Sequence, residues 1–98
     1  MKSVTINEHT YELLKDYREG FELPEVESKL TDYFEDYDYI VGDWAYGKLR
    51  LKGFYDSKNK KVNNINNYNN VDSYIKDFCA NDCKHFIIKK INQILIIR

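Results

Sequence analysis

The chain has 98 residues, enough for one small domain with a modest hydrophobic core. Its formal net charge of −1 disfavours strong affinity for RNA. The longest strictly apolar run, Ile94 to Ile97, cannot span a bilayer, and the first twenty residues lack the apolar stretch of a secretory signal, so we expect a cytoplasmic protein without a membrane partner.

The two halves of the chain carry opposite charge. Residues 1–44 hold 12 acidic and 4 basic residues, a net charge of −8, and residues 45–98 hold 4 acidic and 11 basic residues, a net charge of +7. Such a division is typical of a chain with a charged partner, but it also arises when two halves fold against each other and neutralise. Both interpretations stay open.

Two strands are predicted first. Residues 4–6 and 10–17 flank a polar turn at residues 7–9. In the second segment, large apolar side chains alternate with polar ones, and this period of two predicts a strand with one buried face. Leu14 breaks the alternation.

An amphipathic helix is predicted next, over about residues 24–36. Pro24 suits the first helical position, where its missing N–H costs nothing. Apolar side chains from Val26 to Tyr37 recur at helical spacing, with acidic side chains on the opposite face. We therefore expect a helix whose outer side is strongly acidic.

The clearest hairpin follows this helix. Residues 39–44 and 48–55 flank the three-residue loop Ala45-Tyr46-Gly47. Glycine at the last position favours such a connection because it adopts the left-handed conformation freely.

The remaining chain predicts one loop, one helix and one or two strands. Residues 56–70 are rich in asparagine and lysine with little to bury, so we expect an exposed, mobile loop. Apolar spacing predicts a short helix over residues 71–79, with Asn70 as its N-cap. Residues 86–91 are typical of a buried strand, and residues 92–98 of a further strand or a frayed tail.

The element order β-β-α-β-β-α-β predicts a single α+β domain over residues 1–98. Because hairpins dominate this order, we expect a largely antiparallel sheet of four to six strands with two helices packed on one face.

One segment carries a family resemblance. Residues 37–55, which read Tyr-Asp-Tyr-Ile-Val-Gly-Asp-Trp-Ala-Tyr-Gly-Lys-Leu-Arg-Leu-Lys-Gly-Phe-Tyr, closely resemble the signature of the YutD-like family of small proteins from low-GC Gram-positive bacteria. Residues 11–21 and the segment with Cys79 and Cys83 are also similar, so the resemblance covers about residues 4–90. It implies a small α+β fold and a cytoplasmic location. It implies no activity and no functional residues, because the family is described as uncharacterised.

The predicted hairpin offers the strongest site candidates. If residue 44 pairs with residue 48 across the loop, one face carries an indole and three cations, because next-but-one residues of a strand share a face. The candidate binding residues, with the tyrosine at the tip, are Trp44, Tyr46, Lys48, Arg50 and Lys52. Lys48 is the weakest cationic candidate, since the family often has glutamine there. The alternative is a solvated face whose cations pair with nearby acids and contribute little.

Other candidate chemistry is weaker. Cys79, Cys83 and His85 lie close in sequence, but structural zinc normally takes four ligands, and only the distant His9 could complete the set. A reducing cytosol disfavours a structural disulfide, so we interpret the cysteines as buried thiols and predict no metal or cofactor. The acids of residues 32–43 lack the spacing of an EF-hand loop, and no catalytic residue is predicted.

The sequence therefore favours a binding or regulatory module over an enzyme. We expect a protein-interaction adaptor that uses residues 39–55, since an acidic helix and a basic sheet suit electrostatically steered docking. Binding to RNA or to the ribosome is the alternative, and self-association is also open. A small enzyme or a metal-binding protein is less well supported, and no small-molecule substrate is evident.

Overall fold

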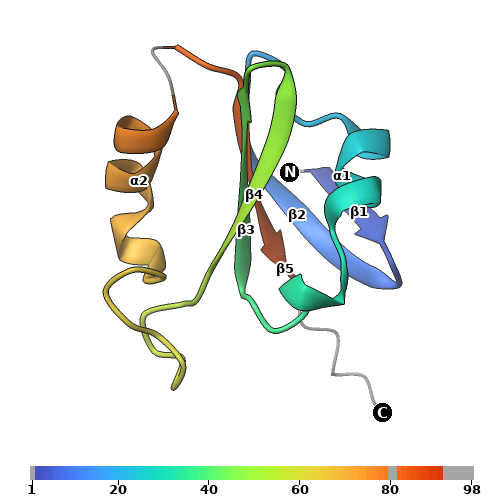
Figure 1. Ribbon diagram of the computed structural model, residues 1–98. Coiled ribbons are helices and arrows are strands. Elements are labelled where there is room, and N and C mark those ends of the chain that lie inside the picture. Colours follow the sequence, from blue (N-terminus) through green and yellow to red (C-terminus); the bar gives the residue numbers. More distant parts are fainter. Residues whose placement is uncertain (1, 80–81, 92–98) are drawn as a thin grey trace.

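The computed structural model describes residues 2–79 and 82–91. Within them the chain forms five strands, two α-helices (α1 and α2) and two short 3-10 helices (η1 and η2), as Figure 1 shows. In chain order these are β1 (Lys2–Ile6), β2 (His9–Tyr17), α1 (Leu23–Lys29), η1 (Asp32–Phe34), β3 (Tyr39–Ala45), β4 (Lys48–Phe54), η2 (Tyr68–Asn70), α2 (Val71–Phe78) and β5 (His85–Lys90). The predicted α+β fold is confirmed.

All five strands form one sheet in the order β1-β2-β5-β3-β4, and every neighbouring pair is antiparallel. The last strand of the chain, β5, lies in the middle of the sheet, between the two hairpins. Its residues Phe86, Ile87 and Ile88 are all buried. An unbroken apolar run of this kind is typical of a strand that is covered on both faces.

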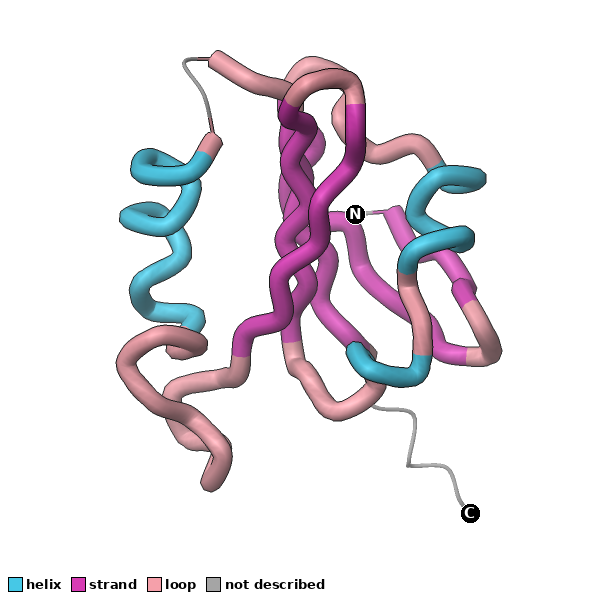
Figure 2. Tube along the Cα trace, in the orientation of Figure 1, coloured by secondary structure: helices cyan, strands magenta, loops and turns pink. Residues whose placement is uncertain are grey.

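The two helices cover opposite faces of this sheet, so the prediction that both pack on one face is wrong (Figures 1 and 2). The core on the α1 face contains Ile6, Tyr11, Val26, Leu30, Ile40, Leu49, Phe86 and Ile88. The core on the α2 face contains Tyr39, Val41, Phe54, Val71 and Ile87. The physical reason is that the central strands β3 and β5 carry large apolar side chains on both faces, so each face needs a covering helix.

The first hairpin has a tighter turn than the sequence predicts. Asn7 and Glu8 have positive φ angles of 52° and 70°, as in the two-residue turns that suit the twist of paired strands. His9 therefore belongs to β2 and pairs with Ile6.

Leu14 breaks the alternation of β2 because this part of the strand packs against apolar groups on both faces, and a β-bulge lies at the same place. The register against β5 shifts between Leu13 and Lys15. Leu13 packs on the α1 face and Leu14 on the α2 face. Consecutive side chains of a strand point to opposite faces, so the two leucines contribute to two different cores.

The helix predicted over residues 24–36 is wrong in length. α1 ends at Lys29, and Leu30 follows with a non-helical ψ of 89°. The Leu30 carbonyl accepts a hydrogen bond from the side-chain Nδ2 of Asn7, which replaces the N–H group that a continuing helix would supply. Pro24 does lie in the first turn of α1.

The asparagine-rich segment 56–70 is stabilised by hydrogen bonds between its side chains and its own backbone. Tyr68 stacks on Tyr39 with ring centroids 3.6 Å apart, which joins the segment to the α2 face. Four side chains accept a hydrogen bond from the backbone N–H two residues later, and they are Asp56, Asn59, Asn63 and Asn67. Such Asx turns explain why this composition suits the segment.

The second helix begins and ends close to its predicted limits. Asn70 precedes α2, but its side chain makes no capping hydrogen bond. The strand or tail predicted over residues 92–98 lies outside the described residues. Within residues 2–79 and 82–91, neither helix is long and apolar enough to cross a membrane.

Candidate binding surface

The turn of the β3–β4 hairpin decides where the predicted binding residues point. Tyr46 and Gly47 both have positive φ angles, of 54° and 76°, so the turn has two residues rather than the predicted three. Trp44 consequently pairs with Leu49 and not with Lys48. The predicted register is wrong by one residue, and a shift of one residue separates side chains that were expected to share a face.

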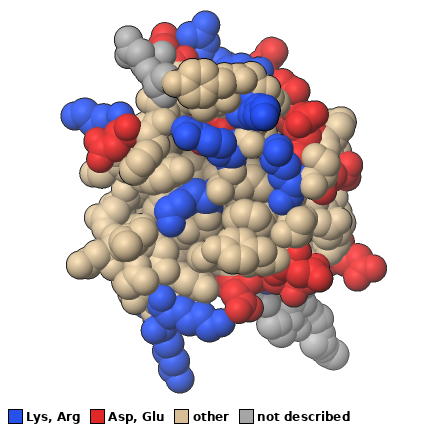
Figure 3. All heavy atoms as spheres, viewed as in Figure 1, with Lys and Arg blue, Asp and Glu red and all other residues tan. Residues whose placement is uncertain are grey.

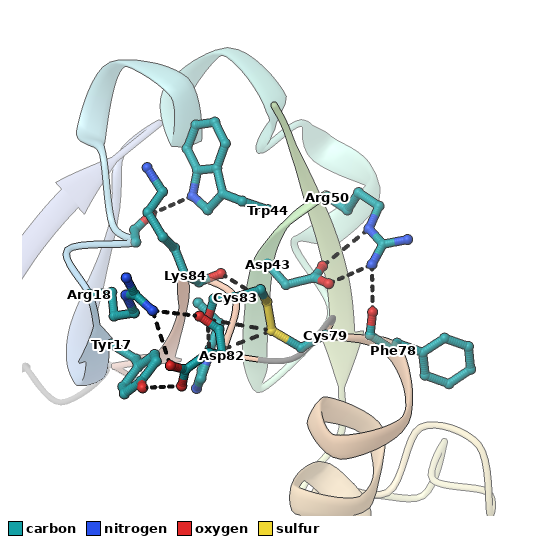
Figure 4. Close-up of a disulfide and its surroundings, with 12 residues drawn as sticks. Tyr17, Arg18, Asp43, Trp44, Arg50, Phe78, Cys79, Asp82, Cys83 and Lys84 are labelled. Atoms are coloured by element: carbon teal, nitrogen blue, oxygen red, sulfur yellow. Dashed lines mark hydrogen bonds and ion pairs between the residues drawn. A yellow bond between two sulfur atoms is a disulfide. The ribbon is translucent and has the colours of Figure 1, made fainter. Parts of the chain in front are cut away.

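Trp44 lies on the α1 face, away from the three cations. Its Nε1 donates a hydrogen bond to the Gly20 carbonyl at 2.8 Å, as Figure 4 shows. The Lys84 Nζ lies 4.4 Å from the centroid of the indole ring. The ring also packs against the core of the α1 face. These contacts satisfy the only donor of the indole, so Trp44 is a packing residue here.

Lys48, Arg50 and Lys52 alternate along β4 and project on the α2 face. Arg50 lies opposite Asp43 in the sheet, and Lys52 lies opposite Val41. Among the five described strands, β4 lies at one edge of the sheet. Figure 3 shows several basic side chains in the middle of the view, where β4 runs nearest the viewer in Figure 1, and acidic side chains mainly toward α1.

Arg50 is held in a fixed position by two partners. Its Nε and Nη2 donate to the Asp43 carboxylate at 3.3 and 2.5 Å, and Nη2 also donates to the Phe78 carbonyl at 2.9 Å (Figure 4). The hydrogen bond with Asp43 raises the pKa of Arg50. Asp43 is only 2% exposed, whereas the Arg50 side chain keeps 46% of its surface exposed. The guanidinium is therefore ordered and still accessible.

Two exposed aromatic side chains belong to the same region. Tyr46 at the hairpin tip is fully exposed, and Phe78 at the end of α2 is 58% exposed. Phe78 stacks on Tyr74 with ring centroids 4.8 Å apart, so α2 orders the ring although it faces solvent. We call the whole set the hairpin surface, and it consists of Tyr46, Lys48, Arg50, Lys52 and Phe78.

Sequence reasoning missed Phe78. Its spacing assigned it to the apolar side of a helix, and the apolar side of a helix is normally buried. In the structure, Phe78 is the last residue of α2, and its carbonyl lies beside the edge strand β4. No sequence signal reports how far the end of a helix extends beyond the sheet that it covers.

The other acidic candidates do not converge on one site. Asp36 pairs with Lys61 at 2.7 Å, and that hydrogen bond lowers the pKa of Asp36. Asp38 accepts hydrogen bonds from the segment 56–70. The His9 Nε2 lies 3.6 Å from the Glu35 carboxylate. Within the described ranges, the carboxylates form no group of three that could hold a metal ion.

Cys79 and Cys83 form a disulfide, which corrects the prediction of free thiols (Figure 4). Their Cα atoms lie 5.7 Å apart, a usual separation for bonded cysteines. His85 lies against the bridge, with its Nδ1 3.7 Å from the Cys79 Sγ. The prediction failed because it was based on the redox compartment expected for the chain, and not on the distance between the two cysteines.

Comparison with known proteins decides the family. Residues 5–89 match the family model described as "YutD-like: Putative antitoxin YutD-like". The chain belongs to the YutD-like family. The resemblance carried by residues 37–55 is thereby confirmed.

Two comparisons with YutD of B. subtilis, one by sequence and one by structure, support this assignment over almost the whole chain. "Putative antitoxin YutD" of Bacillus subtilis (strain 168) is 37% identical over 90 residues, which make up 92% of this chain and 99% of that protein. The solution NMR structure of protein yutD from B. subtilis has 36% sequence identity and a TM-score of 0.78, and the match covers 94% of this chain and 84% of that chain.

Proposed function

We propose that this protein is a non-enzymatic, antitoxin-type module that binds a partner protein through the hairpin surface. The family and the B. subtilis relative both carry the word antitoxin in their names, which supports a protein partner. No activity comes with these names, and the proposal depends mainly on the surface itself.

The observation that carries the proposal is the state of Arg50. Its guanidinium is fixed by Asp43 and by the Phe78 carbonyl, and about half of the side chain stays exposed. Arginine and tyrosine are enriched among the residues that dominate protein–protein binding. A side chain that is already ordered loses less conformational entropy when a partner docks, so it contributes more to the net affinity.

The charge of the hairpin surface indicates the chemistry of the partner. The buried Asp43 neutralises Arg50, but Lys48 and Lys52 have no ion-pair partner in the part of the chain that the structure describes. We therefore expect an acidic patch on the partner, with apolar groups that contact the rings of Tyr46 and Phe78.

Site-specific photo-crosslinking tests this proposal. A photoreactive amino acid at position 46 should capture a protein, and the same amino acid at position 33 should not. Tyr33 is a matched control, because it is also an exposed tyrosine but belongs to η1 on the other side of the sheet. The captured protein should remain after nuclease treatment.

Charge reversal then separates specific from adventitious capture. Lys48→Glu should reduce capture by tenfold or more, and Lys58→Glu, an exposed lysine outside the hairpin surface, should leave it unchanged. Capture that disappears with nuclease and falls steeply with salt would support RNA binding instead. Equal capture from positions 46 and 33 would contradict the proposed surface.

A further inference from the structure

Cys79, Cys83 and His85 converge at one point between α2 and β5. Cys79 directly follows α2, Cys83 lies two residues before β5, and His85 is the first residue of β5. Their possible ligand atoms all lie within 4.8 Å of one another. Across the described residues, no other cluster of histidine, cysteine or acidic side chains meets this condition.

The spacing of these atoms fits a tetrahedral zinc ion. Zinc binds cysteine sulfur at about 2.3 Å and histidine nitrogen at about 2.0–2.1 Å, so a tetrahedral ion holds the two atoms about 3.5 Å apart. The distance between the Cys79 Sγ and the His85 Nδ1 is 3.7 Å. The Cys83 Sγ also lies within 4.8 Å of the histidine ligand atom, and the two sulfur atoms can separate once their bond is reduced.

We propose that, once the disulfide is reduced, Cys79, Cys83 and His85 bind one thiophilic divalent metal ion such as Zn²⁺. The three side chains line one pocket of about 330 Å³, and both cysteines are half-buried rather than enclosed. Three protein ligands leave a fourth position for water, which is the arrangement of an open zinc site.

The carboxylate that lines this pocket does not supply the fourth ligand. Asp82 lines the same pocket, but one of its oxygens accepts a hydrogen bond from the Tyr17 hydroxyl. Its other oxygen accepts one from the Arg18 guanidinium at 3.1 Å. Both oxygens already accept hydrogen bonds, and Asp82 is not part of the group whose ligand atoms lie within 4.8 Å of one another, so the proposed site takes three protein ligands.

The disulfide and the metal exclude each other. Two molecules of a thiol reductant, RSH, supply two electrons that break the S–S bond, and the products are two cysteine thiols and RSSR. Metal binding then releases one proton from each thiol, and a neutral histidine supplies its nitrogen lone pair. Reoxidation by the disulfide RSSR reverses this exchange: two electrons pass from the two thiolates to RSSR, the Cys79–Cys83 bond forms, two RS⁻ leave, and the metal ion loses both sulfur ligands and is released.

His85 contributes less to this site than the two thiolates. Its Nδ1 lies 3.0 Å from the Cys83 carbonyl oxygen, which can only accept, so Nδ1 carries the ring proton. Coordination through Nδ1 breaks this bond and moves the proton to Nε2, which is buried without a hydrogen-bond partner among the described residues. An unpaired buried donor is costly, so part of the metal–nitrogen bond energy is offset.

Titration with Co²⁺ tests the proposal, because thiolate ligation to Co²⁺ produces a charge-transfer absorption that can be measured directly. Protein reduced with a phosphine, and then freed of it under inert gas, should bind one Co²⁺ per chain. An equimolar amount of Zn²⁺ should displace the Co²⁺, since N/S sites bind zinc more tightly. The oxidised protein should show no such absorption.

Variants and one spectroscopic control make the test decisive. Cys79→Ser and Cys83→Ser should each weaken Co²⁺ binding by tenfold or more, and His85→Phe should weaken it less. His9→Asn, at a histidine outside the cluster, should have no effect. If reduction loosens the fold, Zn²⁺ should restore the circular dichroism of the oxidised protein. The proposal is overturned if, with Co²⁺ added, the reduced protein shows no more charge-transfer absorption than the oxidised protein. It is also overturned if the reduced Cys79→Ser variant binds Co²⁺ as tightly as the unsubstituted protein.

Discussion

The two faces of the sheet differ in how completely their side chains are buried. On the α1 face, Val26 and Leu30 are buried. The half-buried Trp44 donates its Nε1 hydrogen bond within the protein, and its ring is in contact with the Lys84 ammonium. On the α2 face, the helix ends beside an edge strand, so Phe78 and Arg50 are ordered but exposed. The comparison separates a face that mainly stabilises the fold from a face that can also meet a partner.

The opposite charges of the two halves of the chain are only partly neutralised by ion pairs between them. Four ion pairs join the acidic first half to the basic second half, and these are Arg18–Asp82, Arg50–Asp43, Lys61–Asp36 and Lys84–Glu22. The two halves therefore neutralise each other in several places. Within the described chain, Lys48 and Lys52 take no part in these pairs, so the hairpin surface keeps a net positive charge.

The largest expected difference in stability is between two phenylalanine-to-alanine substitutions, one on each face of the sheet. Phe86 is fully buried on the α1 face, so Phe86→Ala should lower the free energy of unfolding by about 3–5 kcal/mol. Phe78→Ala removes an exposed ring and should change it by less than about 0.5 kcal/mol, while reducing partner capture. Urea denaturation measures both. Similar losses of stability would contradict the division between the faces.

A smaller loss of stability is expected at Arg50, where the hairpin surface contacts the buried Asp43. Arg50→Ala leaves the buried Asp43 carboxylate without its main partner, and this should lower the free energy of unfolding at neutral pH by about 1–3 kcal/mol. Lys48→Ala on the same strand is the control and should stay within about 0.5 kcal/mol. Restoration of stability by adding Asp43→Asn would show that the unpaired carboxylate causes the loss.

The amphipathic patterns predicted most elements, because periodicity reports which side chains are buried. It did not report on which side of the sheet each helix lies. β5 is adjacent to α2 in sequence but enters the middle of the sheet, and its residues Phe86 and Ile87 face different cores. The end of α1 at Lys29 was also missed, because it depends on a long-range hydrogen bond from Asn7.

The candidate site was predicted in part for a related reason. The cations at positions 48, 50 and 52 do share a face, because alternation along one strand is a local property. Trp44 does not join them, because its face depends on whether the turn has two or three residues. Tyr46 occupies a positive-φ position that sequence rules reserve mainly for glycine, asparagine and aspartate, so the tighter turn was not expected.

Trp44 provides a moderate test of its reassignment to the α1 face. Trp44→Phe keeps an aromatic ring but removes the hydrogen bond to the Gly20 carbonyl, so the free energy of unfolding should fall by about 1 kcal/mol. Crosslinking of a partner from position 46 should not change. Denaturation followed by circular dichroism measures the first quantity. A variant of unchanged stability that loses its partner would return Trp44 to the binding surface.

The smallest expected effect is spectroscopic and concerns Tyr37, which packs beside the core of the α1 face. Its hydroxyl lies 3.4 Å from the Tyr33 hydroxyl, and this contact together with burial raises the pKa of Tyr37 from 10.0 to about 12. The folded protein thus favours the neutral phenol. The resulting stability is complete below about pH 10 and is lost as the pH rises toward 12.

An alkaline titration of phenolate absorbance, subtracting Tyr37→Phe from the unsubstituted protein, should therefore show a midpoint near 12. Tyr33→Phe removes one of the two hydroxyl groups and should move that midpoint back toward the ordinary value of 10.0. Because Tyr33 itself is exposed, its substitution leaves the α1 core intact and changes mainly the hydroxyl contact. A difference curve centred at 10 in the unsubstituted protein would mean that the contact between the Tyr33 and Tyr37 hydroxyl groups does not form in solution and that solvent reaches Tyr37 freely.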